Sequence, residues 1–343
     1  MFLRRCIGAM LLAFGVAGCG AVFLPDGAGT AVPVSERREL PGRVYLLRGL
    51  IGDVFSLGMD DLAAKIQKRG VKASVHGVSA ARFLANDIIK AYRSDRSLAP
   101  IMLIGHSTGG DEIITMAERL KAANIPVALA VAFDPTPIAS DVPSNVELFI
   151  NLYQATNLIG GGRATPGRGF RGRLINVDLR ERREIVHITL DKSPVIHELV
   201  AEKIVGIAER AAAQHQATQH QNAAAGNASN GTTAKMPPPN AVASEIRPLV
   251  MKYVVPANAR IELWDSAISV IVTNDDTLQT IASRTGAPAW AIAQINNVDA
   301  DQALQPGRRL LVPHSVYAPG ALGESEAGAV FGAARVRLPS SNR

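Results

Sequence analysis

The pentapeptide Gly105-His106-Ser107-Thr108-Gly109 has the residue types and spacing that nucleophilic chemistry requires. In a Gly-x-Ser-x-Gly sequence between a strand and a helix, the glycines allow a sharp turn and the serine hydroxyl projects outward. The apolar run 101–104 precedes the turn, and residues 111–123 follow it with acidic residues first and apolar residues on one face. The sequence therefore predicts Ser107 as a nucleophile.

A serine hydroxyl becomes reactive when a histidine takes its proton and a carboxylate orients that histidine. Asp134 follows the apolar run 127–133, and an acid at the carboxyl end of a parallel strand faces the crevice where active sites form. Asp178, inside a later strand, is the alternative acid. Two histidines are candidates for the base: His187 precedes the last helix of this region, and His197 lies in the first turn of that helix.

The Gly-His-Ser-x-Gly-Gly sequence in this setting resembles the α/β-hydrolase family, especially its lipases and esterases. The resemblance covers residues 43–214 and implies the family order of serine, acid and histidine, with Ser107, Asp134 and His187 in these roles. It also implies an oxyanion hole made by the backbone N–H groups of Thr108 and Leu50. Many relatives have His-Gly at the end of the first strand, where this chain has Arg48-Gly49. The resemblance therefore does not fix the backbone geometry near Leu50.

The elements that must position these residues alternate along the chain. Apolar runs predict strands and 3.6-residue periodicity predicts helices, which together indicate an α/β fold with a parallel sheet flanked by helices. Strands are predicted at 43–48, 71–75, 101–104, 127–133, 146–152 and 174–179, with helices at 60–69, 80–92, 111–123 and from 194 onward.

A second region, 268–315, resembles a LysM domain. The resemblance rests on Asp276-Thr277-Leu278, Ile281-Ala282, Gly286, Asn296 and the closing Pro-Gly-x-x-Leu-x-Val-Pro sequence that ends at Pro313. The pattern predicts a small βααβ unit. The resemblance implies binding of N-acetylglucosamine-containing glycans such as peptidoglycan, in a groove between residues 274–278 and 297–303. Its candidate contact residues are Asn274, Asp275, Asp276, Thr277, Leu278 and Asn297.

The N-terminus reads as a targeting signal, with basic residues followed by the short apolar run 7–16. Val16-Ala17-Gly18-Cys19 resembles a bacterial lipobox, which implies a signal peptide at 1–18 and a lipid on the Cys19 thiol. Gly20 follows the cysteine where Asp often favours the inner membrane, so the outer membrane is weakly preferred. We expect a lipid-anchored protein on the periplasmic side of the cell envelope.

The remaining boundaries follow from composition. We expect a tether at 19–42, a disordered linker at 215–245 rich in Ala, Gln, Asn and Pro, and a disordered tail at 316–343. Residues 246–267 receive no assignment. Both cysteines lie in the first 19 residues, so no disulfide framework is predicted for the rest of the chain.

Composition narrows the function. The net charge is +6 over 343 residues, aromatic residues make up 5%, and no recognition motif accompanies them, so nucleic acid is not an expected partner. No His, Cys, Asp or Glu cluster has ligand spacing, so neither a metal nor another cofactor is expected. The sequence favours an envelope serine hydrolase acting on an ester, lipid or thioester and tethered to peptidoglycan. The alternative is a catalytically inert peptidoglycan-binding scaffold.

Overall fold

The computed structural model describes residues 39–50, 56–137, 140–227 and 249–317. The predicted signal peptide, Cys19 and most of the tether and tail lie outside these residues. Among the described helices, none combines the length and hydropathy needed to cross a bilayer.

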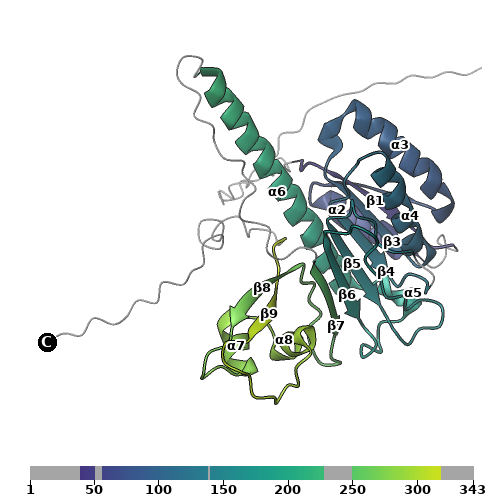
Figure 1. Ribbon diagram of the computed structural model, residues 1–343. Helices are drawn as coiled ribbons and strands as arrows, with labels where there is room; N and C mark the ends of the chain where they lie inside the picture. The colour runs from purple at the N-terminus through teal and green to yellow at the C-terminus, as the bar shows by residue number, and fades with distance from the viewer. Residues whose placement is uncertain (1–38, 51–55, 138–139, 228–248, 318–343) are drawn as a thin grey trace, which may run out of the picture. The chain divides into compact units, whose positions relative to one another are not determined.

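The larger part is a seven-stranded sheet in the order β2-β1-β3-β4-β5-β6-β7, with every neighbouring pair parallel (Figure 1). This confirms the fold class predicted from the sequence. The central strands are buried along their whole length, as expected when both faces of a parallel sheet are covered. The strands are β1 (Arg43–Leu47), β2 (Lys72–His76), β3 (Ile101–His106), β4 (Leu129–Phe133), β5 (Leu148–Tyr153), β6 (Arg173–Asp178) and β7 (Leu249–Val254).

Helices pack on the two faces of this sheet through separate apolar clusters. Alternate strand residues point to opposite faces, so Leu46 and Leu47 belong to different clusters. The helices α2 (Gly58–Lys68) and α6 (Pro194–Asn227) contribute to the first cluster, and α3 (Ala81–Ser94) and α4 (Thr108–Ala122) contribute to the second. The short helix α5 (His187–Leu190) follows β6.

Two sequence expectations need correction. The predicted linker 215–245 begins too early, because α6 continues to Asn227, and its Ala and Gln residues are good helix formers. The unassigned segment 246–267 contains β7, which pairs with β6 and places Met251 and Tyr253 in the core. The region with the hydrolase resemblance therefore does not end at residue 214.

The smaller part is the predicted βααβ unit with its own core. Strands β8 (Ser266–Ile271) and β9 (Arg309–His314) pair antiparallel, and helices α7 (Leu278–Thr285) and α8 (Ala289–Asn296) lie between them in sequence. Leu278, Ile281, Ile292 and Leu310 form the centre of this core.

Candidate active site

Ser107 occupies a tight turn between β3 and α4. Its backbone has φ 55° and ψ −126°, a left-handed conformation that is strained for a residue with a side chain and that is typical of nucleophile turns. A Cβ on Gly105 would collide with the backbone of Gly109, and a Cβ on Gly109 would lie 2.6 Å from the carbonyl oxygen of Leu47. Both glycines of the motif are therefore required for this turn.

His187 lies beside the serine at the first position of α5. Its Nε2 is 3.1 Å from Ser107 Oγ, within hydrogen-bond reach for proton transfer. Its Nδ1 is 2.8 Å from Asp134 Oδ2. If Nδ1 carries the ring proton and donates to Asp134, Nε2 is free to accept the proton of the serine. The structure thus brings the three sequence-predicted residues together in one line of hydrogen bonds.

Asp134 follows β4 and is fully buried. Besides His187, its carboxylate accepts hydrogen bonds from the N–H groups of Gln154 (3.1 Å) and Gly161 (2.7 Å) and from Nδ2 of Asn157 (2.5 Å). Four N–H donors match an ionised carboxylate, which can only accept. These donors keep the carboxylate in place.

The alternative acid and base lie in other environments. Asp178 forms a salt bridge with Arg180 and accepts a 3.0 Å hydrogen bond from the Arg180 backbone N–H. His197 is buried in α6, where its Nε2 donates to the carbonyl oxygen of Asp191 at 2.5 Å. Burial also lowers the pKa of His197. Neither residue is joined to Ser107 by a hydrogen bond in the structure.

The two expected oxyanion donors lie near the serine. Thr108 follows Ser107 directly and begins α4, so its N–H points out of the helix start. Gly49 lies beside Ser107, because a Cβ placed on it would be 3.2 Å from Ser107 Cβ. The N–H of Gly49 donates to Ser56 Oγ at 3.1 Å, which leaves the next amide, Leu50, as the candidate donor on this loop.

His106 connects this loop to the histidine segment. Its Nε2 donates to the backbone oxygen of His187 at 2.9 Å, because a carbonyl only accepts, and its Nδ1 then accepts from Ser56 Oγ at 2.8 Å. Burial lowers the pKa of His106 to about 4, so the ring is neutral near pH 7. The neutral ring fits this bonding pattern.

Sequence reasoning missed Ser56, Asn157 and the residues around Gly161. The only signal in the sequence was the run Gly160-Gly161-Gly162, and a Cβ on the first of these would collide with the Asp134 carboxylate. The Ser56–His106 bond joins residues 50 positions apart and leaves no local pattern.

The candidate glycan residues of the smaller part differ in where they lie. Asn274 and Asp275 are exposed and line a cavity between residues 274–279 and 300–304. Asp276 and Leu278 also line the cavity but are buried: the Asp276 carboxylate accepts from the N–H of Thr273 and pairs with Arg284, and Leu278 is in the core. Thr277 also lines the cavity, where it caps α7.

Asn297 does not line this cavity. It lines a separate depression instead, and its left-handed backbone ends α8.

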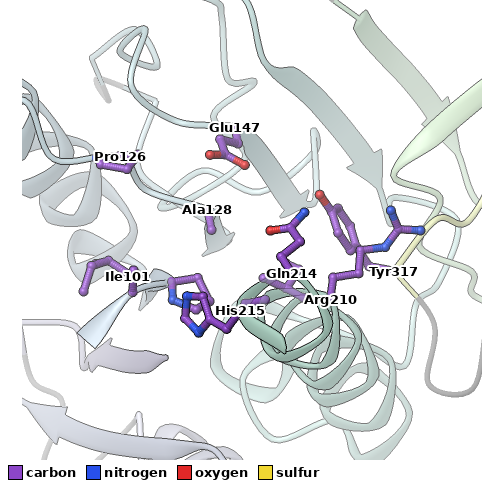
Figure 2. Close-up of a pocket in the computed structure, with 12 residues that line it drawn as sticks. Ile101, Pro126, Ala128, Glu147, Arg210, Gln214, His215 and Tyr317 are labelled. Atoms are coloured by element: carbon purple, nitrogen blue, oxygen red, sulfur yellow. The ribbon is translucent and has the colours of Figure 1, made fainter. Parts of the chain in front are cut away.

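Another cavity lies at the opposite end of the sheet from Ser107. Figure 2 shows Glu147, Arg210, Gln214 and His215 around it, together with Ile101, the first residue of β3. Active sites of parallel sheets form at the carboxyl ends of the strands, which is where Ser107 lies. The cavity in Figure 2 is therefore separate from the candidate active site. In the part of the chain that the structure describes, no group of His, Cys, Asp and Glu side chains could hold a metal ion.

Comparison with known proteins identifies the smaller part. Residues 270–313 match the LysM domain family, so the chain contains a LysM domain.

Three solved structures align with parts of the chain, each with a TM-score of 0.26. A Xanthomonas campestris protein assigned to the α/β superfamily of hydrolases is 13% identical over 37% of this chain and 76% of its own. The thioesterase domain of NocB from the nocardicin cluster is 15% identical over 34% and 72%. An esterase domain from a Rhodothermus marinus protein is 14% identical over 38% and 69%. The α/β class of the larger part follows from its own parallel sheet and flanking helices.

Proposed function

We propose that this chain is a serine hydrolase that transfers an acyl group from an ester-type substrate to water. The observation that carries the proposal is the hydrogen-bonded line from Ser107 through His187 to Asp134, with 3.1 and 2.8 Å between the bonded atoms. Ser107 has a positive φ and lies beside His187, whose Nδ1 is hydrogen-bonded to the buried carboxylate of Asp134. This arrangement is the one expected for an activated serine nucleophile.

The reaction would proceed in two halves. Ser107 Oγ attacks the carbonyl carbon while His187 Nε2 takes its proton, and the N–H groups of Thr108 and Leu50 stabilise the negative oxygen of the tetrahedral intermediate. His187 then protonates the leaving alcohol or thiol, which leaves an acyl group on Ser107. In the second half, His187 takes a proton from water as the water oxygen attacks the acyl carbon. His187 then returns this proton to Ser107 Oγ as the acyl–oxygen bond breaks, which releases the acid and the free serine. Asp134 stays ionised and holds His187 in place throughout.

A fluorophosphonate probe tests this proposal directly, because an activated serine displaces its fluoride. We expect the wild-type chain to be labelled and Ser107→Ala to remain unlabelled. Ser94→Ala, which changes an exposed serine on α3, is the matched control and should be labelled at the wild-type rate. A folded wild-type protein that takes up no label would support the inert scaffold instead.

The LysM domain supports a location in the cell envelope, and we propose that it binds peptidoglycan through the cavity lined by Asn274 and Asp275. Cosedimentation with purified, insoluble peptidoglycan tests this. We expect Asn274→Ala combined with Asp275→Ala to reduce the bound fraction, because both side chains are exposed and their loss leaves the domain core intact. Equal sedimentation of this variant and the wild type would exclude the cavity as the glycan site.

Lipid attachment at Cys19 and an outer-membrane location remain part of the proposal, supported by the lipobox-like sequence. Metabolic labelling with a clickable fatty acid should mark the wild-type protein and not Cys19→Ala. Fractionation of the envelope would then show which membrane holds the labelled protein.

A further inference from the structure

Six large apolar side chains are exposed on three chain segments that border the candidate active site. We call this set the apolar rim, and it consists of Leu50, Leu57, Leu158, Ile159, Val186 and Ile188. Leu158 is 96% exposed and Ile159 is 68% exposed, far more than side chains of this type usually are. The other exposed large apolar side chains of the described residues are Phe83, Val195, Val250, Ile268 and Ile271.

Contacts of neighbouring residues place each part of the rim beside the site. Leu50 follows Gly49, which touches Ser107. Val186 and Ile188 flank His187 on both sides in sequence. Leu158 and Ile159 lie between Asn157, which donates to the Asp134 carboxylate, and Gly160, which packs against the same carboxylate.

Leu57 belongs to the same surroundings, because the preceding residue, Ser56, is bonded to His106 beside the nucleophile. The rim therefore follows the active-site segments.

Exposed apolar residues gathered around a site mark a surface that binds an apolar ligand, a membrane or a protein partner. A protein partner seated here would cover Ser107 and stop the substrate from reaching it. The occupant that is compatible with an accessible serine is the substrate itself. Since the reacting carbonyl sits at Ser107 Oγ, the part of the substrate that reaches the rim is the chain attached to that carbonyl.

We propose that the active site takes esters with long acyl chains, presented at a lipid or micelle surface, and that the apolar rim contacts the acyl chain. This rests on the proposed hydrolase function and names its substrate class. The exposure of the rim explains why a surface is needed: a chain lying across exposed side chains is covered by protein on one side only. The lipid or micelle covers the other side, which removes more apolar area from water.

The test compares kcat/KM for p-nitrophenyl decanoate in nonionic detergent micelles with kcat/KM for p-nitrophenyl butanoate. It uses the chain from residue 20, which keeps every described residue and carries no lipid. The variant is Leu158→Ser with Ile159→Ser. The matched control is Phe83→Ser, which changes a side chain that is 70% exposed but lies on α3, outside the rim.

We expect the wild-type chain and Phe83→Ser to favour decanoate, and the double variant to lower the ratio of decanoate to butanoate about tenfold. Fluorophosphonate labelling of each protein shows whether Ser107 is still reactive. An enzyme that labels and hydrolyses butanoate without preferring decanoate would overturn this inference alone. The same holds if the double variant and Phe83→Ser give equal ratios. A wild-type protein that neither labels nor hydrolyses either ester would instead overturn the proposed function.

Discussion

His106 Nε2 donates to the backbone oxygen of His187 at 2.9 Å, so the residue before Ser107 holds the segment that carries His187. Through Nδ1 the same ring accepts from Ser56, which in turn accepts from the N–H of Gly49 in the loop after β1. One neutral imidazole therefore connects the segments on both sides of Ser107. We regard His106 as a positioning residue.

His106→Ala should lower kcat/KM for a short ester by up to about 100-fold, because a base displaced by about 1 Å loses productive alignment. Burial holds the pKa of His106 at about 4, so the ring stays neutral and the loss should be the same from pH 6 to pH 8. Esterase rates over this range check both statements. His215→Ala, which changes an exposed histidine on α6, is the control. A loss of less than twofold for His106→Ala would show that packing alone positions His187.

Asp134→Asn should reduce the fluorophosphonate labelling rate by about 10³- to 10⁴-fold. An amide NH₂ facing His187 Nδ1 would favour the tautomer with its proton on Nε2, which cannot accept from Ser107. The matched control is Asp178→Asn, which removes the charge of the alternative acid in the salt bridge with Arg180. Labelling rates of the two folded variants decide between the acids: a larger loss for Asp178→Asn would reverse the assignment.

The buried carboxylate of Asp191 should make stability depend on pH. Burial raises its pKa to about 6, although Lys192 and the N–H of Gly58 act in the opposite direction. The folded state thus holds this proton more tightly than the unfolded state, whose pKa is near 3.8. The contribution of Asp191 to stability is therefore largest below about pH 4 and is lost as pH rises through about 6.

Urea unfolding of the wild type and Asp191→Asn at pH 4.5 and pH 7.5 measures this contribution. Asparagine does not titrate, so we expect the difference in unfolding midpoint between the two proteins to shift in favour of the variant as pH rises. Asp95→Asn, which alters an exposed carboxylate, controls for the loss of a charge. A pH-independent difference would mean that Asp191 has no raised pKa.

The buried pair of Lys203 and Asp265 should contribute strongly to stability. Lys203 Nζ is 2.8 Å from the Asp265 carboxylate, both side chains are buried, and Asp265 also accepts from the N–H groups of Val316 and Tyr317. Lys203→Met would remove the nearer of two buried cations from that carboxylate, since Arg173 Nη1 lies 4.0 Å from it, and should cost up to about 3–5 kcal/mol in the free energy of unfolding.

Urea denaturation checks the cost of Lys203→Met. Lys65→Met, which removes a partly exposed lysine from its pair with Glu198, should cost less than about 1 kcal/mol. Similar costs for the two variants would contradict a special role of the buried pair.

The apolar runs and the Gly-x-Ser-x-Gly turn made β3, β4, Ser107 and Asp134 predictable, because each signal is local in sequence. The choice of His187 over His197 followed from the resemblance, and the structure brings His187 and not His197 to the serine. Their roles in catalysis remain predictions.

Other features left no local signal. The donors to Asp134 come from an irregular connection, where hydrogen bonding depends on how the chain folds back. The extension of α6 to Asn227 was missed because a polar composition was interpreted as a linker, although Ala and Gln favour helix. Strand β7 was missed because its partner β6 lies more than 70 residues earlier in the chain.

Strand β7 also determines how this protein can be divided into fragments. A recombinant piece that stops at residue 227 would lack the last strand of the parallel sheet, and the backbone edge of β6 would be left without the partner it has from Arg173 to Asp178. It would also lose Met251 and Tyr253 from the core. Such a truncation should be prone to aggregation through its open strand edge. A fragment intended to keep the parallel sheet should therefore include β7, so that any cut falls after Val254 rather than before Leu249.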